Sequence, residues 1–179
     1  ANYQVNVKFK PFFIPTASVD AEKSSAYLLR MPAAYVKKTG DNLLFTNARA
    51  EADKFIFIEK EQGQYYIYDQ TAKGYIYYVS TDNGSSVKST ASSNVRFTTD
   101  ATEANTWQLL YLSEETAAIV PGSIRNPSAS SASLNFMGGI AGQNVLNLWH
   151  ASDANSAWEI IDPTAGSMPC ATLMYALPG

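Results

Sequence analysis

The 179-residue sequence predicts an all-β fold built from three copies of one unit. The first observation is a motif that occurs three times: a polar or acidic stretch with Ala and Asp or Asn, then an aromatic residue, then a short aliphatic run. The aromatic residues are Phe55, Trp107 and Trp158, so the spacings are 52 and 51 residues. The second observation is that no segment shows the apolar stripe of a helix, while short apolar or alternating runs lie between turn residues. A near-constant period of this kind indicates a repeated structural unit.

Each unit divides into four short strands separated by turn residues such as Lys73-Gly74 and Asp82-Asn83-Gly84. The predicted strands are Ala26–Met31, Ala34–Lys38, Asn42–Thr46 and Lys54–Glu59; Tyr65–Asp69, Tyr75–Ser80, Asn94–Thr98 and Thr106–Leu110; Ala117–Val120, Ser133–Phe136, Asn144–Trp149 and Ala157–Ile161. Twelve short strands in three equal sets predict a β-trefoil, which is a closed six-stranded barrel capped by three hairpins. Closure removes the unpaired edges that an open sheet would present.

The repeats also predict where the domain begins and ends. Residues 24–162 form the β-trefoil. Residues 1–23 give an additional N-terminal strand, in which Asn2–Phe13 alternates, followed by a connector. Residues 163–179 contain three prolines and form either a tail packed on the barrel or the start of a linker.

Composition excludes some partners. The net charge of −3 and the absence of a basic patch argue against nucleic acid binding. No stretch approaches the ~20 consecutive apolar residues of a membrane-spanning helix. Only 16% of residues are charged, while Ser, Thr, Asn and Gln are plentiful. This profile favours a secreted, periplasmic or cell-surface location, although the chain itself carries no signal peptide.

Motifs for catalysis are missing, so the sequence predicts a protein that is not an enzyme and needs no cofactor or metal. His150 is the only histidine and Cys170 the only cysteine. Neither a Gly-x-Ser-x-Gly nucleophile turn nor a phosphate-binding glycine loop is present. The acidic residues lie mainly in turns and between repeats, where solvation accounts for them. A catalytic pair of carboxylates stays open.

The units ending in Trp107-Gln108-Leu109 and Trp158-Glu159-Ile160 resemble the Gln-x-Trp repeats of ricin-type β-trefoil lectins. The third unit, with Leu134–Gly139, Asn144–Trp149 and Asp153–Trp158, looks like the ricin-type modules attached to secreted bacterial glycan-degrading proteins. The resemblance covers residues 24–162 and implies a non-catalytic carbohydrate-binding module whose partners are a glycan and a linked catalytic domain. This sequence departs from the family at the glutamine position, which holds Asp53, Asn105 and Ser156, and at Phe55, where the family has tryptophan.

In that family a working repeat combines an acid, an aromatic platform and an amide. An aromatic ring covers the apolar face of a sugar, and carboxylate or amide groups bond its hydroxyls. In the second unit the resemblance implies Asp69 as the acid and Tyr75 or Tyr77 as the platform. In the third unit the acid position near Gly122 is lost. There it implies Trp149 as the platform and Asn147 or Asn155 as the amide, with Asn135 and Asp153 as further ligand-binding candidates.

A structural role is the alternative for each candidate. Trp149 ends a strand beside His150 and is either an exposed platform or a packing residue. Asp69 precedes a turn and either binds ligand or caps that turn. Asn135 and the glycines after it either shape a turn or let the backbone approach a ligand. Phe55, Trp107 and Trp158 occupy equivalent positions and are predicted to lie in the core.

A second functional hypothesis is a protein-interaction or protease-inhibitor-like β-trefoil, because one fold serves several functions. The tyrosine-rich hairpin formed by Tyr65–Tyr68 and Tyr75–Tyr78 and the long Gly84–Ser93 loop motivate it. Long polar loops often carry contacts with partners.

Overall fold

The structure of the protein is a computed structural model that describes residues 13, 16, 25–164 and 166–167. The described chain contains thirteen strands, three short 3-10 helices and no α-helix. In chain order these are β1 (Leu28–Met31), β2 (Ala34–Thr39), β3 (Asn42–Thr46), η1 (Arg49–Glu51), β4 (Phe55–Glu61), β5 (Gln64–Asp69), β6 (Gly74–Tyr78), η2 (Thr90–Ser92), β7 (Val95–Thr98), β8 (Trp107–Tyr111), β9 (Ala117–Pro121), β10 (Ala132–Asn135), β11 (Asn147–His150), η3 (Ala154–Ser156), β12 (Glu159–Asp162) and β13 (Gly166–Ser167).

The twelve predicted strands are confirmed as β1 to β12, with differences of a few residues at their ends. The largest difference is in β11, which begins at Asn147 rather than at Asn144. The amides of Val145 and Leu146 bond the carbonyls of Val87 and Leu43, in other repeats, at 3.0 and 2.9 Å. Contacts between repeats therefore replace the continuation of the β10–β11 ladder.

Six strands close into a barrel. The ladders β4–β5, β8–β9 and β12–β1 join successive strands, and the ring is completed by single pairs. These pairs are Tyr27↔Phe55, Tyr65↔Trp107 and Ala117↔Trp158. Each single pair joins the first and fourth strands of one repeat and contains one of the three repeated aromatic residues, whereas the ladders join successive repeats.

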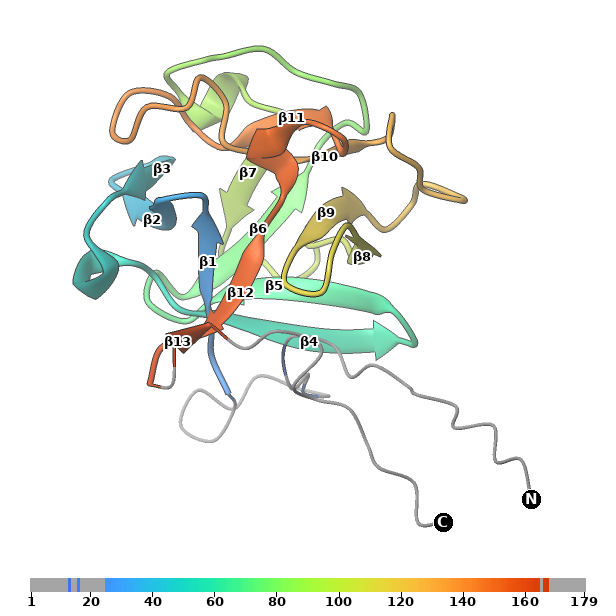
Figure 1. Ribbon diagram of the computed structural model, residues 1–179, viewed down its shortest axis with the longest axis horizontal. Helices are drawn as coiled ribbons and strands as arrows, with labels where there is room; N and C mark the ends of the chain where they lie inside the picture. Colours follow the sequence, from blue (N-terminus) through green and yellow to red (C-terminus); the bar gives the residue numbers. More distant parts are fainter. Residues whose placement is uncertain (1–12, 14–15, 17–24, 165, 168–179) are drawn as a thin grey trace.

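The other six strands form three hairpins, β2–β3, β6–β7 and β10–β11. Figure 1 shows the hairpins toward one end of the molecule and the long β4–β5 pair crossing the other end. The central pairs of the hairpins are equivalent: Val36↔Phe45, Ile76↔Phe97 and Leu134↔Leu148. This arrangement is a β-trefoil, as predicted.

The three repeated aromatic residues lie in the core, which confirms their prediction. Phe55, Trp107 and Trp158 are at most 1% exposed. Trp107 Nε1 donates to the Ile76 carbonyl at 3.0 Å, and Trp158 Nε1 donates to the Leu134 carbonyl at 2.8 Å. Each indole thereby connects the barrel to the hairpin of its own repeat.

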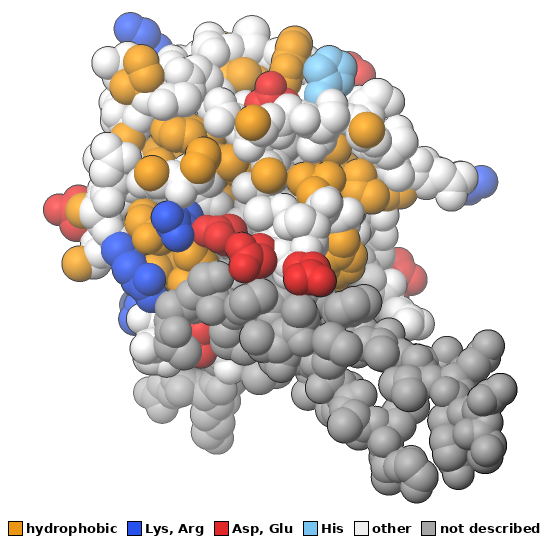
Figure 2. All heavy atoms as spheres, in the orientation of Figure 1, with side chains coloured by type: hydrophobic (Ala, Val, Ile, Leu, Met, Phe, Trp, Pro, Cys, Tyr) orange, Lys and Arg blue, Asp and Glu red, His pale blue; other side chains and the backbone are white. Residues whose placement is uncertain are grey.

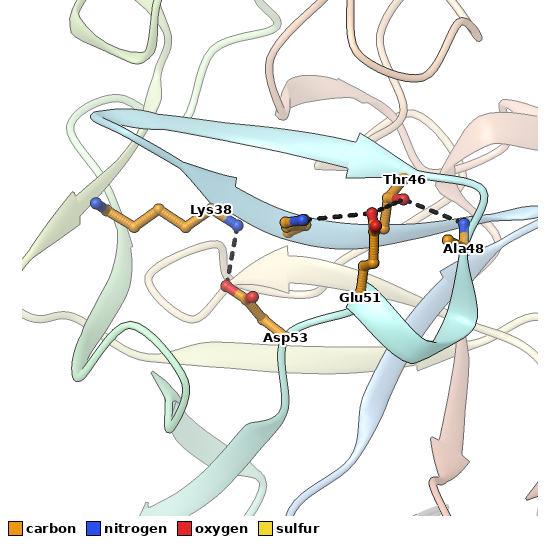
Figure 3. Close-up of polar contacts among 6 residues, drawn as sticks. Lys38, Thr46, Ala48, Glu51 and Asp53 are labelled. Carbon is orange, nitrogen blue, oxygen red and sulfur yellow. Dashed lines mark hydrogen bonds and ion pairs between the residues drawn. The ribbon is translucent and has the colours of Figure 1, made fainter.

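The position two residues before each aromatic supports the same hairpin. The Asp53 carboxylate accepts from the Lys38 amide at 2.9 Å, as Figure 3 shows. Asn105 accepts from the Tyr78 amide at 3.1 Å and donates to the Tyr78 carbonyl at 2.7 Å. Ser156 in the third repeat donates to the His150 carbonyl at 2.8 Å. Each of these three positions thus carries a polar group that fixes the hairpin.

Part of the chain outside the repeats also contributes to the core. Most of the predicted strand Asn2–Phe13 lies outside the described residues, but Phe13 is 2% exposed and stacks on Phe57, with ring centroids 4.1 Å apart. Thr16 bonds the backbone of β4 through Phe57 and Glu59. At the other end β13 pairs with β12. The part of the chain that the structure describes contains no helix with the length and hydrophobicity of a membrane span.

Candidate functional site

Asp69 is buried at the end of β5. Its side chain is 0% exposed, and Oδ1 accepts from the Thr71 and Ala72 amides at 3.0 and 2.8 Å. Burial, and then the neighbouring Asp53 carboxyl, raise the pKa of Asp69 to about 8. The carboxyl group therefore caps a turn and is not accessible to a ligand.

Tyr75 and Tyr77 lie on the outward, partly exposed face of β6. The Tyr75 ring contacts the rings of Tyr66 and Tyr68 at centroid distances of 6.3 and 5.1 Å. Burial, followed by these two neighbours, raises the pKa of Tyr75. The structure brings Tyr75 to a tyrosine cluster on the surface, while Asp69 turns into the interior.

Asn135 and Asn147 face each other across the β10–β11 hairpin and are 2% and 1% exposed. The Asn135 amide donates to Asp153 Oδ1 at 3.1 Å and to Ser156 Oγ at 2.9 Å. Asn147 donates to the Ser85 carbonyl at 2.8 Å and accepts from the Asn94 amide at 3.0 Å. Both side chains use their hydrogen bonds inside the fold.

Asp153 and Asn155 lie at the start of η3 and are partly exposed. Asp153 Oδ1 accepts from the Asn155 amide at 2.8 Å, which caps this short helix. The side chain of Asn155 makes no hydrogen bond to the described residues and faces Gly139. Asp153 Oδ1 is thus engaged by Asn135 and by the Asn155 backbone, whereas the side-chain amide of Asn155 is available to a ligand.

Trp149 is the one tryptophan at the surface, with 36% of its area exposed. It lies on β11 opposite Ser133, and its indole N–H has no partner among the described residues. Its ring meets the His150 ring edge-on, with centroids 4.8 Å apart. Trp149 therefore offers an aromatic surface and a free donor, as the platform prediction requires.

Comparison of the three hairpins shows what Trp149 replaces. The first two repeats have Thr46 and Thr98 at the same register. Thr46 accepts from the Ala48 amide at 3.1 Å and donates to Glu51 at 3.3 Å, as Figure 3 shows. Thr98 makes the equivalent bonds to Asp100 and Glu103.

The third repeat has lost this arrangement. The position of the glutamate holds Ala154, which offers no acceptor on its side chain. The Ala151 amide, equivalent to that of Ala48, donates to the Ser131 carbonyl at 2.8 Å instead. A backbone carbonyl therefore accepts the hydrogen bond that the threonine hydroxyl accepts in the other two repeats, and the third repeat can carry an exposed tryptophan at this position.

The replacement of threonine by Trp149 can be recognised in the sequence, although the repeat motif alone does not reveal it. Thr46, Thr98 and Trp149 each stand nine residues before the core aromatic of their unit. The hairpin loops before them differ in length, so aligning the units from their beginnings hides the correspondence. Counting back from the aromatic residues would have identified Trp149 as the position where the third unit departs.

Polar groups lie next to His150, the ring neighbour of Trp149. His150 Nδ1 lies 3.3 Å from Asn83 Nδ2 and 3.2 Å from the Ser130 carbonyl; it accepts from Asn83 when unprotonated and donates to Ser130 when protonated, so it bonds one of the two loops at a time. Figure 2 shows the histidine, drawn pale blue, at the surface beside hydrophobic and acidic side chains. Asn83 is exposed. We call Trp149, His150 and Asn83 the tryptophan platform.

Metal binding finds no support in the described residues, which contain no group of three or more His, Cys, Asp or Glu side chains placed to hold an ion.

Comparisons with known proteins bear on the fold. No protein-family model matches the chain, and a search of curated proteins found no match. Among solved structures the chain is similar to a designed 3-fold symmetric protein, ThreeFoil, with a TM-score of 0.53 and 11% sequence identity. The match covers 76% of this chain and 98% of that chain. At this identity the similarity concerns the fold alone, and it supports the β-trefoil assignment.

Proposed function

We propose that this protein is a non-catalytic carbohydrate-binding domain that binds a glycan on the tryptophan platform. The observation that carries the proposal is the replacement at one register position of the hairpins. Two repeats use it for a threonine hydrogen-bonded to a glutamate, and the third presents an exposed indole. An exposed aromatic side chain that makes no hydrogen bond to the described residues is a feature that ligand binding explains.

The chemistry of the platform suits a sugar. The indole supplies a flat apolar surface with a polar donor at its edge. Asn83 and His150 stand beside it with groups that can bond hydroxyls. The β10–β11 ladder holds Trp149 and His150 in place before a ligand arrives, which lowers the entropy cost of binding.

The proposal also includes where the protein acts and which catalytic domain it is linked to. The resemblance to ricin-type modules and the polar, weakly charged composition favour a glycan outside the cell, with a linked hydrolase as the catalytic partner. In this setting the domain supplies affinity, and the linked enzyme supplies the reaction.

A glycan array, followed by calorimetric titration of the best ligand, tests the proposal. Trp149→Ala is expected to weaken binding by about tenfold or more, because a central aromatic contact is worth on the order of 1.4 kcal/mol or above. Trp149→Phe retains the ring surface and should lose less. Tyr111→Ala is the matched control, since Tyr111 is an aromatic residue with 50% exposure outside the platform.

Thermal unfolding should show that Trp149→Ala is folded, since the side chain is exposed and makes no hydrogen bond. Absence of binding to a broad panel of plant, bacterial and host glycans would contradict the proposal. Equal loss of binding in Tyr111→Ala would show that the effect is not specific to the platform.

Protein interaction is the second candidate, and the tyrosine cluster of Tyr66, Tyr68 and Tyr75 favours it. These rings cover the outer face of β5 and β6, and tyrosine is enriched at protein interfaces. The Gly84–Ser93 loop gives less support, because it is bonded to the first and third repeats along much of its length. A purified partner whose binding is lost in Tyr68→Ala/Tyr75→Ala, and is unaffected by sugars, would favour this candidate.

A further inference from the structure

A cleft of about 300 Å³ lies at the boundary between the first and third repeats. One wall is the β1–β2 turn with Pro32 and Ala33, and the other is the β10–β11 loop with Ile140. Phe136, 5% exposed, contributes to its lining, and its ring packs on Phe45 with centroids 4.1 Å apart. Trp149 does not line this cleft.

The walls are fixed by bonds between the two repeats. The Gly142 amide donates to the Phe45 carbonyl at 3.1 Å, which ties the β10–β11 loop to the first hairpin. The Phe136 amide donates to the Asn155 carbonyl at 2.9 Å, which places η3 at the side of the cleft. The cleft is therefore formed before any ligand binds.

Its polar groups are two amides without structural partners. Asn155 and Asn47 line the cleft, and neither side chain makes a hydrogen bond to the described residues. Each amide offers both donors and an acceptor. Ile140, 51% exposed, and Pro32 add apolar surface beside them.

The chemistry of the lining restricts the ligand. No charged side chain is among the residues that line the cleft, and burying an unpaired charge there would cost free energy. The volume lies at the lower end of the range for small-molecule pockets. A compact neutral ligand with an apolar face and several hydroxyl or amide groups fits these conditions.

We propose that this cleft is a second binding site, which takes one neutral sugar ring through Asn155 and Asn47. This inference deepens the proposed function and rests on it for the class of ligand. The geometry of the cleft is independent of Trp149, so the two sites can be tested separately in one experiment.

The test is an NMR titration of the whole chain with two reporters. The Ile140 methyl group reports on the cleft, the Trp149 indole N–H reports on the platform, and the buried Ile119 methyl is the internal control. The probes are the neutral sugars glucose, galactose and N-acetylglucosamine, and the cationic sugar glucosamine. A Kd of about 1 mM is sufficient for detection and corresponds to a weak single-ring site.

The expected result is a saturable shift of the Ile140 methyl with at least one neutral sugar and a smaller one with glucosamine. Ala33→Trp, which places a bulky side chain from an exposed turn into the cleft, should abolish the shift. Asn155→Ala should weaken binding at this site about tenfold, and Gln143→Ala, which removes an exposed amide of the same loop outside the cleft, should leave it unchanged.

The outcomes separate the two proposals. A shift of the Trp149 indole without a shift of Ile140 would leave the platform standing and overturn the cleft site. A shift of Ile140 that survives in Trp149→Ala would support the cleft whatever happens at the platform. A shift of Ile140 that persists in both Ala33→Trp and Asn155→Ala, or that arises with a blocked neutral dipeptide and not with sugars, would overturn the sugar site.

Discussion

Asp69 shows how one residue can couple the fold to pH. Its Oδ2 atom is buried and receives no hydrogen bond from the described residues, and the Asp53 carboxyl, itself 3% exposed, lies beside it. Two carboxylates cannot bond each other unless one of them carries a proton. The fold therefore favours the protonated form of Asp69, which can donate to Asp53.

Unfolding of the wild-type protein should consequently become easier as pH rises. The pKa of Asp69 is about 8 in the fold against an ordinary value of 3.8, so the folded state binds more protons than the unfolded chain between these values. The stabilisation that Asp69 contributes is therefore fully present below pH 3.8, the ordinary pKa, and is lost as pH rises through about 8, the pKa in the fold. We expect the free energy of unfolding to fall steadily across this window, because the unfolded chain releases the Asp69 proton more readily than the folded state.

Urea unfolding of wild type and Asp69→Asn at a series of pH values checks this expectation. The Asn side chain retains the acceptor for Thr71 and Ala72 and adds a neutral donor toward Asp53. The variant should show a flatter pH dependence and exceed wild type in stability at alkaline pH. Parallel pH profiles of the two proteins would show that the Asp69 carboxyl does not cause the effect.

Among the structural elements, the connection between β6 and β7 joins the three hairpins. It is long and polar, which at the sequence level favours a free interaction loop. In the fold it is held by bonds to the two other hairpins, among them Thr90 to Asn42 in the first repeat and Ser93 Oγ to the Leu146 carbonyl in the third. Asn147 bonds this connection near both of its ends, at Ser85 and Asn94. The connection thus links the three hairpins into one cap.

Asn147→Ala should release this connection without unfolding the domain. The Ser85 carbonyl and the Asn94 amide, both part-buried, would lose their partner, at a cost of about 1 kcal/mol. Lys88 is exposed on the released segment, so limited digestion with trypsin should cut the variant there faster than wild type. Ser86→Ala, a change at an exposed side chain of the same connection, serves as the control, and equal cleavage of all three proteins would refute the role of Asn147.

Strand prediction succeeded at this scale because each strand is short, strongly apolar and bounded by turn residues. The predicted site residues on the same elements differ in whether their side chains reach the surface. Trp149 lies at the surface, while Asp69, Asn135 and Asn147 are buried. Their direction depends on register and on hydrogen bonds to residues far along the chain, such as Asn147 to Ser85. A local pattern does not contain that information.

At the scale of the whole molecule the barrel depends on residues outside the three repeats. Phe13 stacks on Phe57 at an interplanar angle of 15° and meets Tyr65 edge-on, with centroids 5.1 Å apart. It belongs to the same core cluster as Phe55 and Trp107. A segment preceding the first repeat thus supplies part of the core.

Phe13→Ala should therefore destabilise the domain strongly. Removing a buried phenylalanine costs about 3–5 kcal/mol through lost burial and the cavity that remains. For a domain of this size the midpoint of thermal unfolding should fall by about 10 °C. Val79→Ala, at a side chain 47% exposed, is the control and should change little. A shift for Phe13→Ala no larger than that of the control would show that Phe13 does not contribute to the core.

The sequence by itself determined the fold. Phe55, Trp107 and Trp158 each lie in the pair that joins the first and fourth strands of a repeat in the barrel. Because this position is buried in every repeat, it requires an aromatic residue followed by aliphatic ones, and that pattern is visible in the sequence. The tertiary structure alone decided which polar residues reach a surface. It buried Asp69 beside Asp53, exposed Trp149, and joined Asn47 and Asn155 across a boundary between repeats. The physical reason is that burial and hydrogen bonding depend on contacts between distant segments, which the chain acquires only when the barrel closes.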